Sequence, residues 1–442
     1  MGQGVSFSRL AAVACAGALL VFPALFGGCV PGPSGPSIVV VTIDTLRADH
    51  LGSYGYFRDT SPSLDRFARE SLLFENAFST AAVTLPAHVA LWTSRYPNDT
   101  GIFRNKFIFS PQGIGPPRLF AQWLRDGGWR TAAFVSATPL GAETGLPAGF
   151  ERYKGPGHSM RPAADTTDRA LAWLADVDEP YFLWVHYFEP HGPYAPPEEF
   201  RRFEADAGLD AFLEAREFAD STDADVRERH DLYDGEIAAT DAAFSRLVAA
   251  LQARGGWDEL AVVVTADHGE GLMEHGVAGH VHLGREQLHV PLLMKLPRSL
   301  GIAPSRRSEI VSTVDIIPTL VANLGLPVPA VVAEEFEGVD LLRESRQEAF
   351  SQAGQSRHSL VTDAWRFVEH PDRVQLFDRR SDPHELLDVA ATHPEVVARL
   401  RARAIELAGE ATDSGVLFEV QARPSGERRR QLRALGYVVD PD

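Results

Sequence analysis

Four short runs of β-branched, aliphatic and aromatic residues restrict this chain to a narrow range of folds. Runs of this length without regular polar alternation are typical of strands buried on both faces of a sheet. Segments with helical periodicity, such as 117–125 and 234–251, lie between them. Because strands alternate with helices, the sequence predicts an α/β fold with a doubly wound, mostly parallel sheet flanked by helices. The four runs are residues 37–43, 130–135, 181–187 and 260–265.

The strand and helix pattern becomes looser around residues 296–304 and changes character toward the C-terminus. Residues 365–369 and 375–383 predict small antiparallel strands with a turn at Asp382-Pro383, and 394–410 predict a helix. We therefore expect two parts: a larger α/β domain and a smaller C-terminal subdomain with an antiparallel sheet and a helix. The predicted boundaries are 38–330 and 331–442.

The first residues resemble an export signal. An apolar run follows Arg9 and leads through two glycines to Cys29, after which the sequence is rich in Pro, Gly and Ser. The pattern predicts a signal peptide over 1–29, with Cys29 as the lipidated residue of a bacterial lipoprotein, and a linker over 30–37. A plain signal segment is the alternative. Both alternatives predict an exported protein, and a lipid anchor or a retained signal segment attaches it to a membrane on the periplasmic or cell-surface side.

Cysteine content and charge exclude several kinds of function. The chain has two cysteines, Cys15 and Cys29, so no disulfide, cysteine metal site or cysteine nucleophile is possible beyond residue 29. The formal net charge of −18 argues against nucleic acid as a partner, because nucleic-acid binders need a dense basic face. We expect a small-molecule or lipid-headgroup substrate.

Two predicted strands end in residues that bind metal ions in many proteins. The run at 37–43 is followed by Asp44, and the run at 260–265 is followed closely by Asp267 and His268. The carboxyl ends of parallel strands meet at one edge of a sheet, where ligands bind. Either Asp alone could instead cap a helix. Together these oxygen and nitrogen donors favour a site for a divalent cation.

Thr84 is the candidate nucleophile. It precedes Pro86 at the predicted start of a helix, where free N–H groups and the helix dipole attract an anionic ester. For an isolated threonine, helix capping is the commoner role.

Several segments in chain order resemble the sulfatase branch of the alkaline phosphatase superfamily. Thr84-x-Pro86-x-His88 lies where that family has Cys/Ser-x-Pro-x-Arg, and His191 lies in a segment similar to its Asp-Pro-His-x-Pro-Tyr. The other matching segments are 43–55, 91–97, 267–276, His280, 290–292, 376–385 and 432–437.

The resemblance implies specific roles for the residues at matching positions. Asp44, Asp267 and His268, with the Thr84 hydroxyl beside them, would bind one divalent metal, Mn²⁺, Zn²⁺, Mg²⁺ or Ca²⁺. His191 and His280 would contact the transferred group or protonate the leaving oxygen, in place of a second metal. The remaining candidates are His88 for catalysis and Asn105 for substrate binding.

Three departures from the family pattern shape the expected chemistry. Formylglycine is made from Cys or Ser, so Thr84 should not yield it. Thr45 replaces a second Asp, which makes a calcium site less favoured, and His88 replaces an Arg. We therefore expect hydrolysis or transfer of phosphate esters through Thr84. The alternatives are a true sulfuric ester hydrolase without formylglycine and a catalytically silent, membrane-anchored binding protein.

Other polar residues near these segments have weaker signals. Glu270 and Glu274 fit structural roles better than acid or base roles, and Asp315 fits a helix cap. No motif assigns a role to His186 or His289.

Overall fold

The computed structural model describes residues 35–105, 109–110, 118–157, 160–204, 207–216, 224–409 and 419–420. The predicted signal peptide with Cys29, most of the predicted linker and the matching segment at 432–437 lie outside the described residues.

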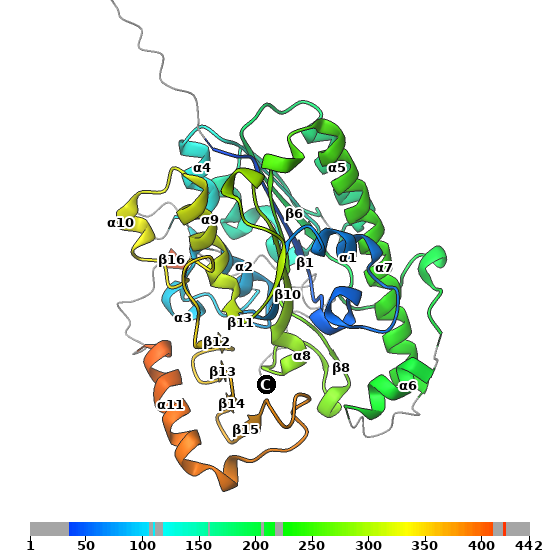
Figure 1. Cartoon of the computed structure of the whole chain (residues 1–442), viewed down its shortest axis with the longest axis vertical. Helices are drawn as coiled ribbons and strands as arrows, with labels where there is room; N and C mark the ends of the chain where they lie inside the picture. The colour runs from blue at the N-terminus through cyan, green and yellow to red at the C-terminus, as the bar shows by residue number, and fades with distance from the viewer. Residues whose placement is uncertain are drawn as a thin grey trace, which may run out of the picture. The chain divides into compact units, whose positions relative to one another are not determined.

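An eight-stranded sheet forms the centre of the molecule (Figure 1). β10 is antiparallel to both of its neighbours, while all other neighbouring strands are parallel. The predicted mostly parallel α/β sheet is therefore confirmed. In spatial order the strands are β11 (Ser305–Ser312), β2 (Leu72–Phe78), β10 (His289–Lys295), β7 (Ala261–Ala266), β1 (Ile38–Ile43), β6 (Tyr181–Tyr187), β4 (Arg130–Val135) and β5 (Arg152–Lys154).

Helices cover both faces of this sheet, as a doubly wound fold requires. Figure 1 shows α1, α5 and α7 on one side of the sheet and α2, α4 and α9 on the other. The helices are α1 (Pro62–Ala68), α2 (Thr84–Thr93), α3 (Pro97–Thr100), α4 (Phe120–Asp126), α5 (Ala163–Leu174), α6 (Ala207–Glu214), α7 (Ala224–Arg254), α8 (Arg285–Leu288), α9 (Ile316–Leu324), α10 (Ala330–Ala333) and α11 (Pro394–Ala408).

The apolar runs of the sequence became the central strands. All residues of β1, β6 and β7 are buried, because helices cover both faces at the middle of the sheet. Three strands on one side of β7 were not predicted. β2 contains Glu75 and Asn76, β10 contains Pro291, and β11 is polar at its outer end, so none of them gives a continuous apolar signal.

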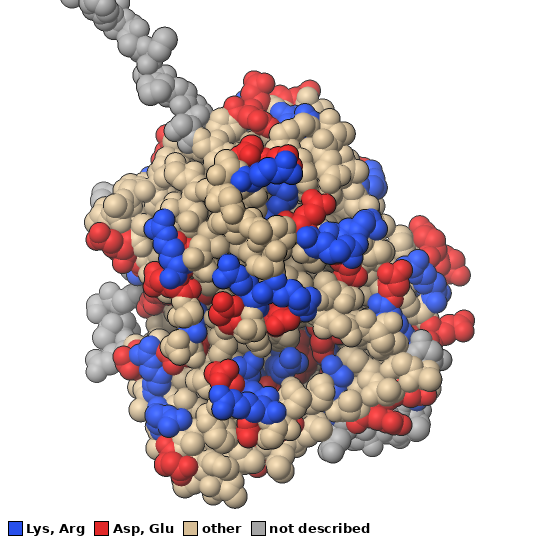
Figure 2. All heavy atoms as spheres, in the orientation of Figure 1, with Lys and Arg blue, Asp and Glu red and all other residues tan. Residues whose placement is uncertain are grey.

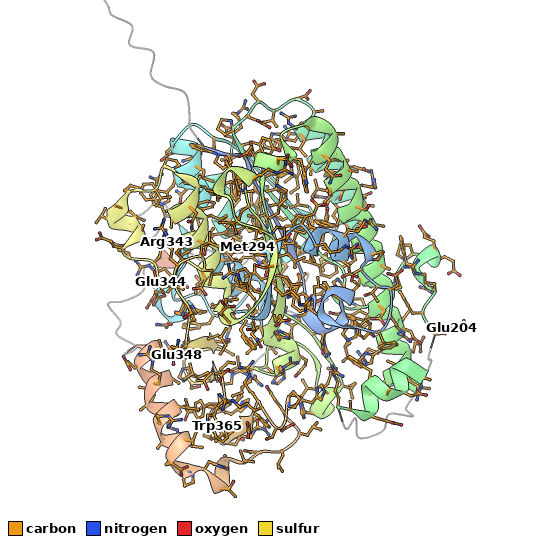
Figure 3. All side chains as sticks on the ribbon, in the orientation of Figure 1. Glu204, Met294, Arg343, Glu344, Glu348 and Trp365 are labelled. Atoms are coloured by element: carbon orange, nitrogen blue, oxygen red, sulfur yellow. The ribbon has the colours of Figure 1, made fainter. Side chains whose placement is uncertain are left out.

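A second, antiparallel sheet of four strands follows in the chain, with α11 packed against it. Figure 3 labels Glu348 and Trp365 on this sheet and Met294 on β10. Its strands are β12 (Glu348–Gln352), β13 (His358–Thr362), β14 (Trp365–Glu369) and β15 (Val374–Asp378). Two short strand pairs complete the described elements, β8 (Gly271–Leu272) with β9 (Ala278–Gly279) and β3 (Phe109–Ser110) with β16 (Glu419–Val420).

The C-terminal sheet shares a hydrophobic cluster with the central sheet. Phe78 at the end of β2 and Leu288 at the end of α8 pack in one cluster with Ala349 and Val361 of the C-terminal sheet. Arg379, next to β15, donates a hydrogen bond to the Asn76 side chain on β2. Figure 2 shows acidic and basic side chains intermixed over this face, with basic side chains inside a hollow between α8 and the C-terminal sheet. Among the described residues, no helix has the length and apolar character of a membrane span.

Asp315 connects the end of β11 to the segment that leads into the C-terminal sheet. Its carboxylate accepts the Ser312 N–H at 2.8 Å, which is the capping role that the sequence predicted. It also accepts the Val339 N–H at 2.9 Å and forms an ion pair with Arg346 at 2.6 Å. The Asp315 side chain is fully buried.

We expect Asp315→Ala to lower the free energy of unfolding by about 3–5 kcal/mol, because it removes the carboxylate partner of the partly buried Arg346 guanidinium and the acceptor of two backbone N–H groups. Urea denaturation followed by circular dichroism measures the change. The matched control is Asp363→Ala, which removes an ion pair with Arg380 at the surface and should change stability by no more than about 0.5 kcal/mol. Equal effects in both variants would contradict the assigned role.

Candidate functional site

The register of the central strands brings two carboxylates together. β1 pairs Ile43 with Ala266 of β7, so the residues that follow, Asp44 and Asp267, leave neighbouring strands at the same edge of the sheet. Both side chains are buried, at 0% and 4% exposure. Asp267 Oδ1 accepts the backbone N–H of Thr45 at 3.2 Å and that of His268 at 2.8 Å. These two bonds fix the carboxylate and leave its other oxygen directed into the site.

Thr45 takes an uncommon backbone conformation to make its bond. Its φ of 56° lies in the left-handed region, which is unfavourable for a β-branched residue. This conformation directs the Thr45 N–H toward Asp267 immediately after Asp44 ends the strand. Local strain therefore accompanies the pairing of the two carboxylates.

His268 and Thr84 complete a compact group. His268 Nδ1 lies 3.0 Å from the Gly269 carbonyl oxygen and must donate to it, which leaves the Nε2 lone pair free. Nε2 lies 3.8 Å from Asp44 Oδ1, 3.6 Å from Asp267 Oδ2 and 3.5 Å from Thr84 Oγ1. Thr84 is the first residue of α2 and is fully buried. All four predicted metal-site residues are therefore in one place.

These residues fit a divalent cation. In the described part of the chain, both oxygens of Asp44 and Oδ2 of Asp267 are buried without a hydrogen-bond partner. Burial raises the pKa of Asp44 well above its usual value, and the Asp267 charge raises it further. Burial likewise raises the pKa of Asp267 to about 6 and lowers that of His268 to about 3. Two carboxylates and a neutral imidazole lone pair that face one another need a positive charge between them.

His88 lies beneath Thr84 in α2 and supports it. Its Nδ1 lies 2.8 Å from the carbonyl oxygen of Thr84, and its Nε2 lies 3.0 Å from Thr42 Oγ1. Trp184 donates its indole N–H to the same Thr42 oxygen at 2.9 Å. His88 therefore joins the start of α2 to the face of β1 and β6, and its contacts are those of a positioning residue.

His191 and His280 form a pair on the other side of His268. Their Nε2 atoms lie 3.1 Å apart, and the ring centroids of His280 and His268 are separated by 4.5 Å. Nδ1 of His191 faces the Gly192 carbonyl oxygen, and Nδ1 of His280 faces that of Ala82. If each Nδ1 donates to its carbonyl, one proton between the two Nε2 atoms satisfies both rings.

Asn105 lies at the start of α2. Its Oδ1 accepts the backbone N–H of Leu85 at 2.8 Å, next to the candidate nucleophile Thr84. The side chain is 3% exposed, and in the described part of the chain its Nδ2 donor has no partner. An amide held at one end with a free buried donor at the other is suited to bind an oxygen of a ligand.

His186 lies close to the candidate metal ligands, although the sequence analysis assigned it no role. His186 lies within β6, is fully buried, and places its Nε2 3.7 Å from Asp44 Oδ2. The β1–β6 register pairs it with Thr42, two residues before Asp44. The presence of a histidine in an otherwise apolar, buried strand was the sequence signal that could have identified His186. Glu274 has the structural role that the sequence favoured, since it binds the buried Arg47 at 2.5 Å.

Comparisons with known proteins identify relatives of this chain. A family model described as Sulfatase matches residues 36–326. The chain is 24% identical over 454 residues to arylsulfatase K of Bos taurus, covering 83% of this chain and 81% of the relative. It is 24% identical over 469 residues to the multifunctional alkaline phosphatase superfamily protein PehA of Trinickia caryophylli, covering 80% and 91%. The phosphonate monoester hydrolase of Agrobacterium radiobacter has a similar fold, with a TM-score of 0.69, 21% identity, and coverage of 85% and 96%.

Removal of divalent metal should destabilise the protein in a pH-dependent way. The raised pKa values of Asp44 and Asp267 mean that the folded, metal-free protein binds protons more tightly than the unfolded chain does. Its free energy of unfolding therefore falls as the pH rises from about 4 through about 6.

Cation binding reverses this effect, because the metal replaces those protons. We expect Mn²⁺ or Zn²⁺, added to metal-free protein at about 100 times the Kd of the ion, to raise the free energy of unfolding by about 2.7 kcal/mol at pH 8. The gain should be smaller by about 1.4 kcal/mol or more at pH 5. Thermal denaturation at both pH values measures it, and Asp267→Asn should abolish most of the metal response. A metal response that is larger at pH 5 would contradict the assignment.

Proposed function

The chain belongs to the sulfatase family and is a hydrolase of that type, and we propose that it cleaves or transfers phosphate esters with Thr84 as the nucleophile. The contact that carries the proposal is the one between Thr84 Oγ1 and His268 Nε2, 3.5 Å apart at the N-terminus of α2. It places a hydroxyl beside the two carboxylates that suit a metal. Members of the family generally bind a divalent metal, and the buried group formed by Asp44, Asp267 and His268 is suited to hold it.

In this proposal the Thr84 hydroxyl loses its proton to water and its oxygen forms a bond to phosphorus, while the bond from phosphorus to the leaving oxygen breaks. The resulting phosphothreonine is then attacked by water, or by an acceptor hydroxyl in a transferase. A bound divalent cation supplies positive charge that stabilises the negative charge on the transferred group. Asn105 Nδ2 is suited to bind an oxygen of that group. His88 holds the Thr84 carbonyl and thereby the start of the helix.

The His191–His280 pair is the candidate proton donor for the leaving oxygen. A proton shared by two Nε2 atoms 3.1 Å apart can pass to an oxygen that approaches them. Burial lowers the pKa of His191 to about 3 and that of His280 well below its usual value, so the pair gains this proton only when the negative charge of a bound ester lies beside it. Both rings lie on the open side of His268, away from the strands.

We further propose that the enzyme is exported and attached to a membrane through Cys29, so that its substrate is a small-molecule or lipid-headgroup ester on the far side of that membrane. The support for this part comes from the sequence of residues 1–37 alone. Mass spectrometry of the protein from membranes would detect a diacylglyceryl group at Cys29.

A sulfuric ester hydrolase without formylglycine is the second candidate. The similarity to arylsulfatase K favours it. Thr84 disfavours it, because the side chain has no thiol or primary alcohol to oxidise to an aldehyde. The catalytically silent reading is disfavoured by the buried, unpartnered carboxylate oxygens, which destabilise a protein that has no cation to bind them.

Thr84→Ala should lower kcat for an aryl phosphodiester by at least about 10³-fold, because the variant has no oxygen to form the intermediate. Thr84→Ser is the matched variant and should retain turnover, since it keeps the hydroxyl. Steady-state kinetics with added Mn²⁺ or Zn²⁺ measures both. Undiminished activity in Thr84→Ala would exclude Thr84 as the nucleophile.

One preparation of the wild-type protein should prefer aryl phosphate or phosphodiester over aryl sulfate by at least about 10-fold in kcat/KM. The reason is that attack by an alkoxide on phosphorus leaves a phosphothreonine that water can hydrolyse, whereas the sulfatase route needs the aldehyde hydrate. If both esters release the same phenol, its rate of release from each ester gives the ratio of the two kcat/KM values. A preference for the sulfate would select the second candidate.

A further inference from the structure

His186 is buried in the middle of the molecule without a normal hydrogen-bond partner. It lies in β6 with 0% exposure, and among the residues described here neither ring nitrogen has a partner. Its ring packs against His88, with centroids 5.0 Å apart, on the face covered by α2. Buried imidazole nitrogens are nearly always hydrogen-bonded or bound to a metal.

The two carboxylates of the site face histidines on both sides. Asp44 directs Oδ1 toward His268 Nε2 at 3.8 Å and Oδ2 toward His186 Nε2 at 3.7 Å. Asp267 Oδ2 lies 3.6 Å from His268 Nε2 and 3.7 Å from His88 Nδ1. Each carboxylate therefore lies between two groups of donors, one toward the candidate nucleophile and one toward the interior.

We propose that the site binds two divalent cations, one at His268 and a second at His88 and His186, with Asp44 and Asp267 shared between the two ions. The donor atoms of His88, His186 and Asp267 lie within 4.8 Å of one another, as do those of Asp44, Asp267 and His268. Two imidazoles and two carboxylate oxygens suit Zn²⁺, which is usually tetrahedral, and they are also ligands of Mn²⁺, which takes a higher coordination number. Coordination by His88 Nδ1 replaces its present hydrogen bond to the Thr84 carbonyl oxygen.

Charge balance favours a second cation. One divalent ion compensates the charges of Asp44 and Asp267, and Glu270, three residues after Asp267, is a further buried acidic side chain. A phosphate ester brings further negative charge, so this argument rests on the proposed function. The second cation, on the interior side of the two carboxylates, compensates this additional negative charge. His88 connects it to the start of α2.

Metal content and spectroscopy of the full chain, purified in detergent, test the proposal. The protein is chelated, loaded with MnCl₂ alone, freed of excess metal by gel filtration and analysed by mass spectrometry for metal. We expect about two Mn²⁺ per chain, with the exchange-coupled electron paramagnetic resonance spectrum of ions about 3.5–4 Å apart. His186→Gln should bind about one Mn²⁺ and give the spectrum of an isolated ion.

His280→Gln is the matched control, because the His280 ring also lies close to His268, with centroids 4.5 Å apart, but His280 belongs to neither group of candidate ligands. It should retain both ions and the coupled spectrum. One Mn²⁺ per wild-type chain, or loss of an ion in His280→Gln and not in His186→Gln, would overturn the proposal. If His186→Gln does not fold, the wild-type stoichiometry and spectrum decide alone. Thr84-dependent turnover with one bound ion would leave the proposed function standing while this inference fails.

Discussion

Repulsion between two buried carboxylates is the constraint around which this site is built. Asp44 and Asp267 leave adjacent parallel strands in register, so the backbone itself forces them together. Backbone N–H groups compensate only Oδ1 of Asp267. The remaining oxygens face imidazole lone pairs and a hydroxyl. The folded chain tolerates this arrangement because a cation or protons can bind between the carboxylate oxygens. The extensive packing of the surrounding sheet offsets the free energy lost by burying the two carboxylates together.

The same sheet determines what each histidine can do. His268 follows a strand and keeps its Nε2 lone pair toward the carboxylates by donating Nδ1–H to a carbonyl. His191 and His280 come from loops at the rim, where a substrate can approach. His88 and His186 come from α2 and β6 and lie on the interior side. Position in the fold therefore separates residues suited to contact substrate from residues suited to hold the metal site in place.

Much of this arrangement could be predicted from the sequence, because its signals are local. Apolar strands that end in Asp44 and in Asp267-His268 already indicated that these residues meet at one sheet edge, and Pro86 indicated that Thr84 lies at the start of a helix. β2, β10 and β11 lack a continuous apolar pattern and were missed. His186 was missed as well, since its closeness to Asp44 depends on the β1–β6 register. The register between two strands that are distant in the chain produces no pattern in the sequence of either strand, so it could not be predicted.

The reversed direction of β10 also affects how this enzyme can diversify. β7 ends, and β10 begins, at the edge of the sheet that carries the metal ligands, so residues 267–288 leave and return on one side without crossing the sheet. Residues 275–282 in the middle of that segment are partly or fully exposed, so insertions or deletions there can reshape the surroundings of His280 while the strands keep their register. Natural variation in substrate choice can therefore accumulate in one excursion of the chain, with little penalty for folding.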